Sequence, residues 1–223
     1  MTTRRWRPSA RADRGHAPEL GALDSRHLVR WVNVQDVTAS TGFGRPVPPY
    51  LYDLTSADGM ASLLATVLAV SERPATPLLE ELAHTEIRIE VLSSTDGELT
   101  ASEHHRLDAS PITSAHRRAE LLRTKDGIVA AETELIILAQ RLPTGGRAAL
   151  AGAGIPVGEV LAQLGARRLD RRALCRGGCQ DSAGKDVAVE SLAVLAIGDT
   201  KVGITTERIT GAFCRLATER SSL

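Results

Sequence analysis

Two short turns, each flanked by runs of aliphatic residues, place the strongest constraint on what this chain can fold into. The first is Asp126-Gly127, which separates the strand-like runs 118–123 and 128–137. The second comprises residues 198–201 and separates the runs 187–197 and 202–209. Asp-Gly between two such runs is a good hairpin signal, and residues 198–201 contain a similar Gly-Asp pair. Each turn therefore predicts two adjacent antiparallel strands.

The rest of the pattern adds helices without a regular strand-helix repeat. Residues 86–92 alternate charged and aliphatic side chains, which predicts one more strand with a wet face. Four segments have features of helices: 23–33, 60–72, the segment that starts with Thr76 as N-cap and Pro77 as first helical residue, and 159–164 before Gly165. Because strands and helices do not alternate, the sequence predicts an α+β fold with an antiparallel sheet.

The 223 residues are enough for one large domain. The first part of the chain is rich in Arg, Pro and Ala and has no hydrophobic period, so residues 1–22 are expected to be a disordered basic tail. Residues 23–218 are then expected to form a single domain.

Composition narrows the classes of partner. Lys and Arg together number 27, as do Asp and Glu, so no global field attracts nucleic acid or anionic lipid. With two Trp, two Tyr and two Phe, a surface of stacked aromatic residues for nucleic acid is not expected. No apolar stretch is long enough to span a membrane, and three cysteines in a chain of this length favour a reducing, cytoplasmic setting. These features favour a small-molecule partner.

Few residues stand out as carriers of chemistry. Cys175 and Cys179 lack a second pair of ligands at zinc-site spacing, so no metal site is expected. Arg118 opens the first hairpin and Glu207 ends an aliphatic run, where an inward carboxylate would need a partner. The pattern alone leaves open whether these two side chains face the interior or the solvent.

The order and separation of several segments resemble the chorismate lyase family and its related domains, from about Pro77 to Phe213. The resemblance implies one α+β domain whose antiparallel sheet and flanking helices enclose a small aromatic acid in a buried pocket. The segments that carry the resemblance are 78–82 with the strand 87–92, 118–122 with the Asp126-Gly127 turn, 131–133 with 141–143, 155–161, and Thr206-Glu207.

The resemblance implies a function and a set of site residues. The reaction is elimination of pyruvate from chorismate to give 4-hydroxybenzoate, which needs no cofactor because aromatisation drives it. Arg118 matches the arginine that binds the ligand carboxylate, and a guanidinium is suited to bidentate recognition of such a group. Val157, with Gly158 beside it, matches the backbone that contacts the same carboxylate at the start of a helix. Glu207 matches the carboxylate near the ring hydroxyl, the expected acid/base group.

Some features depart from the family pattern. Segment 54–76 is longer than the family's opening, and the strand 187–197 contains Glu190 where a basic residue is usual. Arg117 precedes Arg118, so a shift of one residue would exchange the arginine that faces the pocket. Two alternatives to the lyase therefore stay open: a related enzyme acting on another aromatic-acid precursor, and a non-catalytic sensor domain that binds an aromatic ligand. The sequence does not indicate an oligomeric state.

Overall fold

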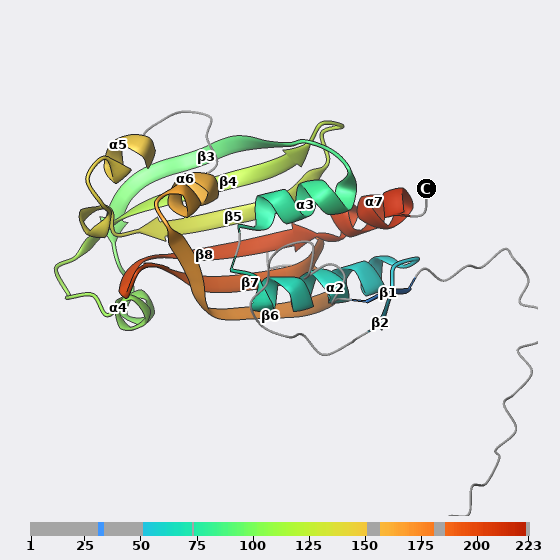
Figure 1. Cartoon of the computed structure of the whole chain (residues 1–223), viewed down its shortest axis with the longest axis horizontal. Helices are drawn as coiled ribbons and strands as arrows, with labels where there is room; N and C mark the ends of the chain where they lie inside the picture. Colours follow the sequence, from blue (N-terminus) through green and yellow to red (C-terminus); the bar gives the residue numbers. More distant parts are fainter. Residues whose placement is uncertain (1–30, 34–50, 73, 151–156, 181–185, 222–223) are drawn as a thin grey trace, which may run out of the picture.

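A six-stranded antiparallel sheet organises the fold (Figure 1). The computed structural model describes residues 31–33, 51–72, 74–150, 157–180 and 186–221. The order across the sheet is β3-β4-β5-β8-β7-β6, and all neighbouring strands are antiparallel. The strands are β3 (Ile87–Glu98), β4 (Ser114–Thr124), β5 (Val129–Ile137), β6 (Ala166–Gln180), β7 (Asp186–Ile197) and β8 (Thr200–Thr210).

The two predicted hairpins are confirmed and lie at the centre of this sheet. The first is β4–β5 and the second is β7–β8, and the sheet joins them through the β5–β8 pair. Gly127 and Gly198 have φ values of 84° and 57° in the two turns, a region that glycine enters without steric cost. The α+β prediction with an antiparallel sheet is likewise confirmed.

Helices cover the two faces of the sheet unequally. Most lie on one side, here called the inner face, and are drawn in front of the strands in Figure 1. On the outer face, α4 (Ala101–Leu107) contributes Leu107 to a small core with Val194 and Ile204. The inner-face helices are α2 (Ala57–Val70), α3 (Ala75–Ala83), α5 (Gly146–Leu150), α6 (Val157–Gln163) and α7 (Gly211–Ser221).

The inner face has two apolar clusters rather than one continuous core. Helices α2, α3 and α7 pack on Leu122, Ala131 and Ile209 at one end of the sheet. Helices α5 and α6 pack on Leu135 and Leu195 toward the other end. The functional candidates lie between these clusters.

Several predicted boundaries are corrected. Helix α3 begins at Ala75 with Pro74 at the N-cap, so Thr76 lies within its first turn. Residues 31–33 of the expected helix 23–33 instead form β1 (Trp31–Asn33), which pairs with β2 (Leu51–Asp53). The remainder of that helix and the expected tail 1–22 lie outside the described residues. Helix α7 continues to Ser221, beyond the expected domain end at 218.

Strand β6 is the largest element that the sequence pattern did not reveal. Among the described strands it pairs with β7 alone, and its register shifts twice along that pairing. An edge strand keeps much of its surface in solvent and tolerates many polar residues. Its arginine-rich sequence, ARRLDRRALCRGGCQ, therefore lacks the alternation by which a strand is recognised.

Candidate ligand-binding site

A row of buried polar side chains crosses the inner face between the two apolar clusters. Glu120 of β4 pairs in register with Thr133 of β5, Thr133 pairs with Glu207 of β8, and Glu207 pairs with Ser191 of β7. All four are at most 8% exposed. The next row on one side is entirely aliphatic: Leu122, Ala131, Ile209 and Val189. Polar groups at this depth need partners.

Glu207 obtains its partners from two other strands. Its Oε2 accepts a hydrogen bond from Nη2 of Arg168 at 2.9 Å and another from the Ser191 hydroxyl at 2.5 Å. Arg168 stands on β6 and reaches past β7, while Ser191 is the register neighbour of Glu207 on β7. Side chains of the Arg168–Glu207 pair are only 3% and 7% exposed, so this carboxylate is neutralised inside the protein.

A second buried ion pair joins Arg118 and Glu120, two residues apart on β4. Nε of Arg118 lies 2.6 Å from Oε1 of Glu120, and Nη1 donates to the Leu150 carbonyl at 3.3 Å. Nη2 of Arg118 has no hydrogen-bond partner among the described residues. Burial raises the pKa of Glu120, although the neighbouring Arg118 acts in the opposite direction. One guanidinium therefore offsets only part of the cost of burying this carboxylate.

The polar row borders a cavity between the sheet and helices α3 and α6. The volume that the centre of a water-sized sphere can occupy in it is about 50 Å³, which is several times the volume that one water molecule requires. Much of its wall is aliphatic, from Leu122, Leu135, Leu161 and Leu195. Thr133 lines this cavity, and its buried hydroxyl has no hydrogen-bond partner among the described residues. The combination of an aliphatic wall with a few convergent polar groups is typical of small-molecule sites.

A wider hollow adjoins the cavity between the starts of α3 and α6. It shares Glu72, Pro74, Ala162 and Ala166 with the cavity wall, so the two spaces are neighbours at this border. Gly158 lies here, and a Cβ on it would come within 3.3 Å of the Pro74 Cβ. Because Gly158 has no side chain, the space between it and Pro74 at this border is not filled. Glu72 forms a loose ion pair with Arg171 of β6 at 3.7 Å.

The sequence-derived site residues fall at different distances from the cavity. Glu207 and Gly158 line it. Arg118 is not among the described residues that line the cavity, but it contacts Glu120, which does line it. Val157 is the first residue of α6, and its buried side chain packs with Leu135 and Leu161 rather than lining the cavity. The ligand contacts expected of these four residues stay predictions.

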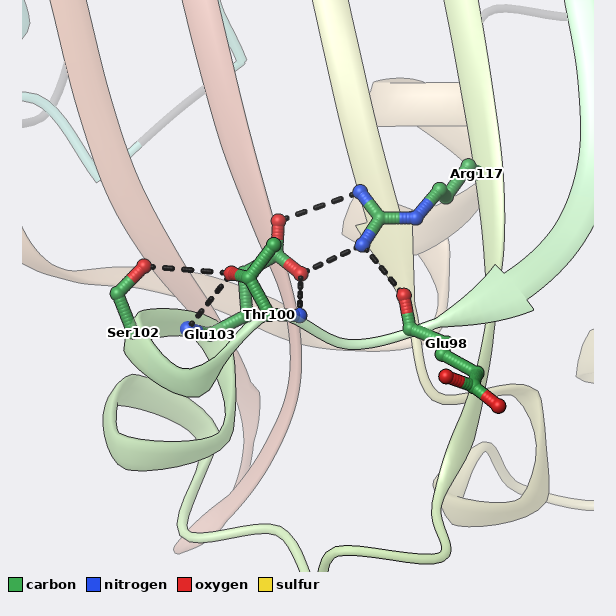
Figure 2. Close-up of polar contacts among 5 residues, drawn as sticks. All are labelled: Glu98, Thr100, Ser102, Glu103 and Arg117. Carbon is green, nitrogen blue, oxygen red and sulfur yellow. Dashed lines mark hydrogen bonds and ion pairs between the residues drawn. The ribbon is translucent and has the colours of Figure 1, made fainter.

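The choice between Arg117 and Arg118 is resolved by the register of β4. Arg118 is 6% exposed and faces the inner side. Arg117 faces the outer side, where Nη2 lies 2.5 Å from Oε2 of Glu103 and donates to the Glu98 carbonyl at 2.7 Å (Figure 2). Thr100 and Glu103 also form a capping box at the start of α4. Arg117 thus anchors α4 and takes no part in the cavity.

Four residues of the site, Glu120, Thr133, Ser191 and Arg168, were not anticipated. Glu120 lies two residues after Arg118 on β4, and Thr133 is its register partner on β5. The two-residue period of a strand therefore indicates that these side chains share the face of Arg118. Arg168 gave no such signal because β6 was not recognised. Glu190, which departs from the family pattern, lies on the outer side of β7 with Arg176 and Arg208. The guanidinium near Glu207 therefore comes from β6 instead of β7.

Comparison with solved structures assigns the fold. The chain resembles PhnF from Mycobacterium smegmatis. The TM-score is 0.50 at 10% sequence identity, and the match covers 64% of this chain and 65% of PhnF, less than two thirds of that protein. The fold is therefore the chorismate lyase-like α+β fold.

The chain also has a weaker similarity to the effector domain of PhnF. The TM-score is 0.47 at 12% identity, and the match covers 62% of this chain and 89% of that one. Another is to the ligand-binding domain of a putative GntR-family transcriptional regulator from Bordetella bronchiseptica, with a TM-score of 0.43 at 10% identity, covering 56% and 84% of the two chains. No protein-family model and no curated protein matches the sequence.

Two negative findings concern only the described part of the chain. Its histidine, cysteine and acidic side chains form no group of three or more that could hold a metal ion. None of its helices is long and apolar enough to cross a membrane.

Proposed function

We propose that this chain is a ligand-binding domain that takes up a small organic molecule between the sheet and helices α3 and α6, without transforming it. The observation that carries the proposal is the buried hydroxyl of Thr133, a residue in the wall of a largely aliphatic cavity, which has no hydrogen-bond partner within the described part of the chain. An unsatisfied buried hydroxyl is costly, and a ligand that hydrogen-bonds it would recover that cost.

The pairing of the charged groups supports binding over catalysis. Oxygen Oε2 of Glu207 already accepts hydrogen bonds from Arg168 and Ser191, so it is held in place by the protein itself. Arg118 is likewise engaged by Glu120. A general base has to be able to take a proton from the substrate, and a carboxylate fixed in an ion pair is poorly suited to that role. The fold shared with PhnF does not assign a role, because one fold hosts many functions.

Elimination of pyruvate from chorismate is the second candidate. The observation that favours it is that Glu207 and Gly158, two of the residues expected from the lyase resemblance, border the same cavity. Catalysis would require the substrate to displace Arg168 or Ser191 from Glu207, or to use the other carboxylate oxygen.

One experiment separates the two candidates. The purified chain is incubated with chorismate, and pyruvate and 4-hydroxybenzoate are measured while thermal unfolding is followed with a panel of small organic acids, amines and alcohols. A binding domain releases no pyruvate and is stabilised by at least one class of ligand. A ligand at one hundred times its Kd would add about 2.7 kcal/mol, or about 5–10 °C in melting temperature. Release of both products at equal rates, lost in Glu207→Gln, would establish the lyase instead.

A further inference from the structure

The charges around the cavity are unequal in sign. Among the described residues that line it, Glu72, Glu120 and Glu207 are acidic and Arg168 is the basic one. Arg168 and Glu207 neutralise each other, and Glu72 lies at the border with the outer hollow, near Arg171. Glu120 is therefore the interior carboxylate whose counterion, Arg118, is not itself part of the wall.

Glu120 lines the cavity, and the hydrogen bonding of its carboxylate is incomplete among the described residues. Its side chain is 4% exposed, and its Oε1 lies 2.6 Å from Nε of Arg118 without a hydrogen bond of good geometry. Burial raises the pKa of this carboxyl group despite Arg118, which indicates that desolvation is not fully offset. A second cation or donor on the cavity side would stabilise the carboxylate.

Thr133 offers a second acceptor at the same place. Thr133 is the register partner of Glu120 on the adjacent strand and also lines the cavity, and its buried hydroxyl oxygen has no partner among the described residues. A carboxylate and a neighbouring hydroxyl together suit a group with several donors and no acceptor, which describes a protonated amine. A carboxylate ligand would instead meet Glu120, which carries the same charge.

We propose that the ligand of this site is a small primary amine with an apolar body, whose ammonium group binds between Glu120 and Thr133. The body lies against the aliphatic wall of Leu122, Leu135 and Leu161 and extends toward the outer hollow. This inference rests on the binding function proposed above, and it specifies the charge of the ligand. The site discriminates by charge, because an amine and a carboxylate of the same shape bury the same apolar surface.

The test uses matched probes that differ only in the head group. Binding of benzylamine, benzyl alcohol and benzoate to the full chain is measured by calorimetry at neutral pH, together with isopentylamine, isopentanol and isovalerate. The amines are expected to bind at least tenfold more tightly than the corresponding carboxylates. Glu120→Gln should reduce amine affinity at least tenfold, whereas Glu98→Gln, an exposed residue on β3, should leave it unchanged.

The outcomes separate this inference from the function on which it rests. Tighter binding of the carboxylates or alcohols would overturn the amine specificity and leave the binding function intact. Failure of every probe in both series to bind would overturn both. If Glu120→Gln does not fold because Arg118 is left unpaired, Thr133→Val tests the same point: it should weaken amine binding more than binding of the alcohols, and an equal loss for both would contradict the proposal.

Discussion

Arg168 and Glu207, 39 residues apart in the chain and separated by strand β7, form a buried ion pair with 2.9 Å between Nη2 and Oε2. The pair fixes the edge strand β6 to the centre of the sheet. It also sets the electrostatic character of the cavity, since it neutralises one of the two interior carboxylates. Ser191 completes the arrangement by donating to the same oxygen.

Breaking this pair should destabilise the fold strongly. Arg168→Met leaves the buried Glu207 with the Ser191 hydroxyl as its one partner among the described residues, and the free energy of unfolding should fall by about 3–5 kcal/mol. The double variant Arg168→Met, Glu207→Gln removes both charges and should recover most of that loss. Urea unfolding of the two single variants and the double variant measures the coupling. Additive losses would show that the two side chains act independently.

The Thr133 hydroxyl should contribute nothing to the stability of the free protein. Thr133→Val conserves shape and removes a buried group that has no partner among the residues the structure describes, so the free energy of unfolding should stay constant or rise by up to about 1 kcal/mol. Thr124→Val is the matched control, because the buried Thr124 hydroxyl accepts a hydrogen bond from the Ile128 N–H at 3.1 Å. That variant should lose about 1–3 kcal/mol. An equal loss in both, measured by urea unfolding, would mean that Thr133 has a partner.

Glu103 should make stability fall in acid. Burial alone would raise its pKa, but hydrogen bonds from Arg117 and from the Thr100 backbone, with the charge of Arg117, hold the pKa of Glu103 below its ordinary value of 4.5. A lowered pKa in the folded state means that the contribution is present above about pH 4.5 and is lost as pH falls through the folded-state pKa.

The Glu103→Gln variant tests this sign. It should lose about 0.5–1 kcal/mol at neutral pH, as for a weakened helix cap and a partly exposed ion pair. The difference from the parent chain should shrink as both are titrated into acid, which unfolding by denaturant at several pH values measures. A difference independent of pH would assign the effect to helix capping without charge.

Cys175 and Cys214 should differ sharply in reactivity. Cys175 is exposed, whereas burial raises the pKa of Cys214 to about 12, with Cys175 and Asp186 adding to the effect. The thiolate is the reactive form, so Cys214 should be inert in the folded protein. In a Cys179→Ser background, an aromatic disulfide reagent at pH 8 should modify Cys175 rapidly and Cys214 only upon unfolding. Rapid modification of both remaining thiols under native conditions would contradict the burial of Cys214 on α7.

Local sequence was sufficient where local chemistry sets the structure. The turns at Asp126-Gly127 and residues 198–201 specified the two central hairpins, because a tight turn and two apolar flanks are encoded within about 20 residues. The same alternation contained the information that Arg118 and Glu120 share a face, although only the register of β4 with β5 decided that Arg118, and not Arg117, is the inward residue.

Tertiary structure decided the rest of the site. Strand β6 carries no alternating pattern, and its place in the sheet depends on pairing with β7, so the contact between Arg168 and Glu207 was invisible in the sequence. The absence of a partner for Thr133 within the described residues likewise depends on every neighbour around it. The sequence by itself determined the hairpins and the fold class, because turn geometry and alternation are short-range properties. Only the folded chain decided which charges neutralise each other and which polar group lacks a partner within the described residues, because pairing across strands and burial are set by distance in space.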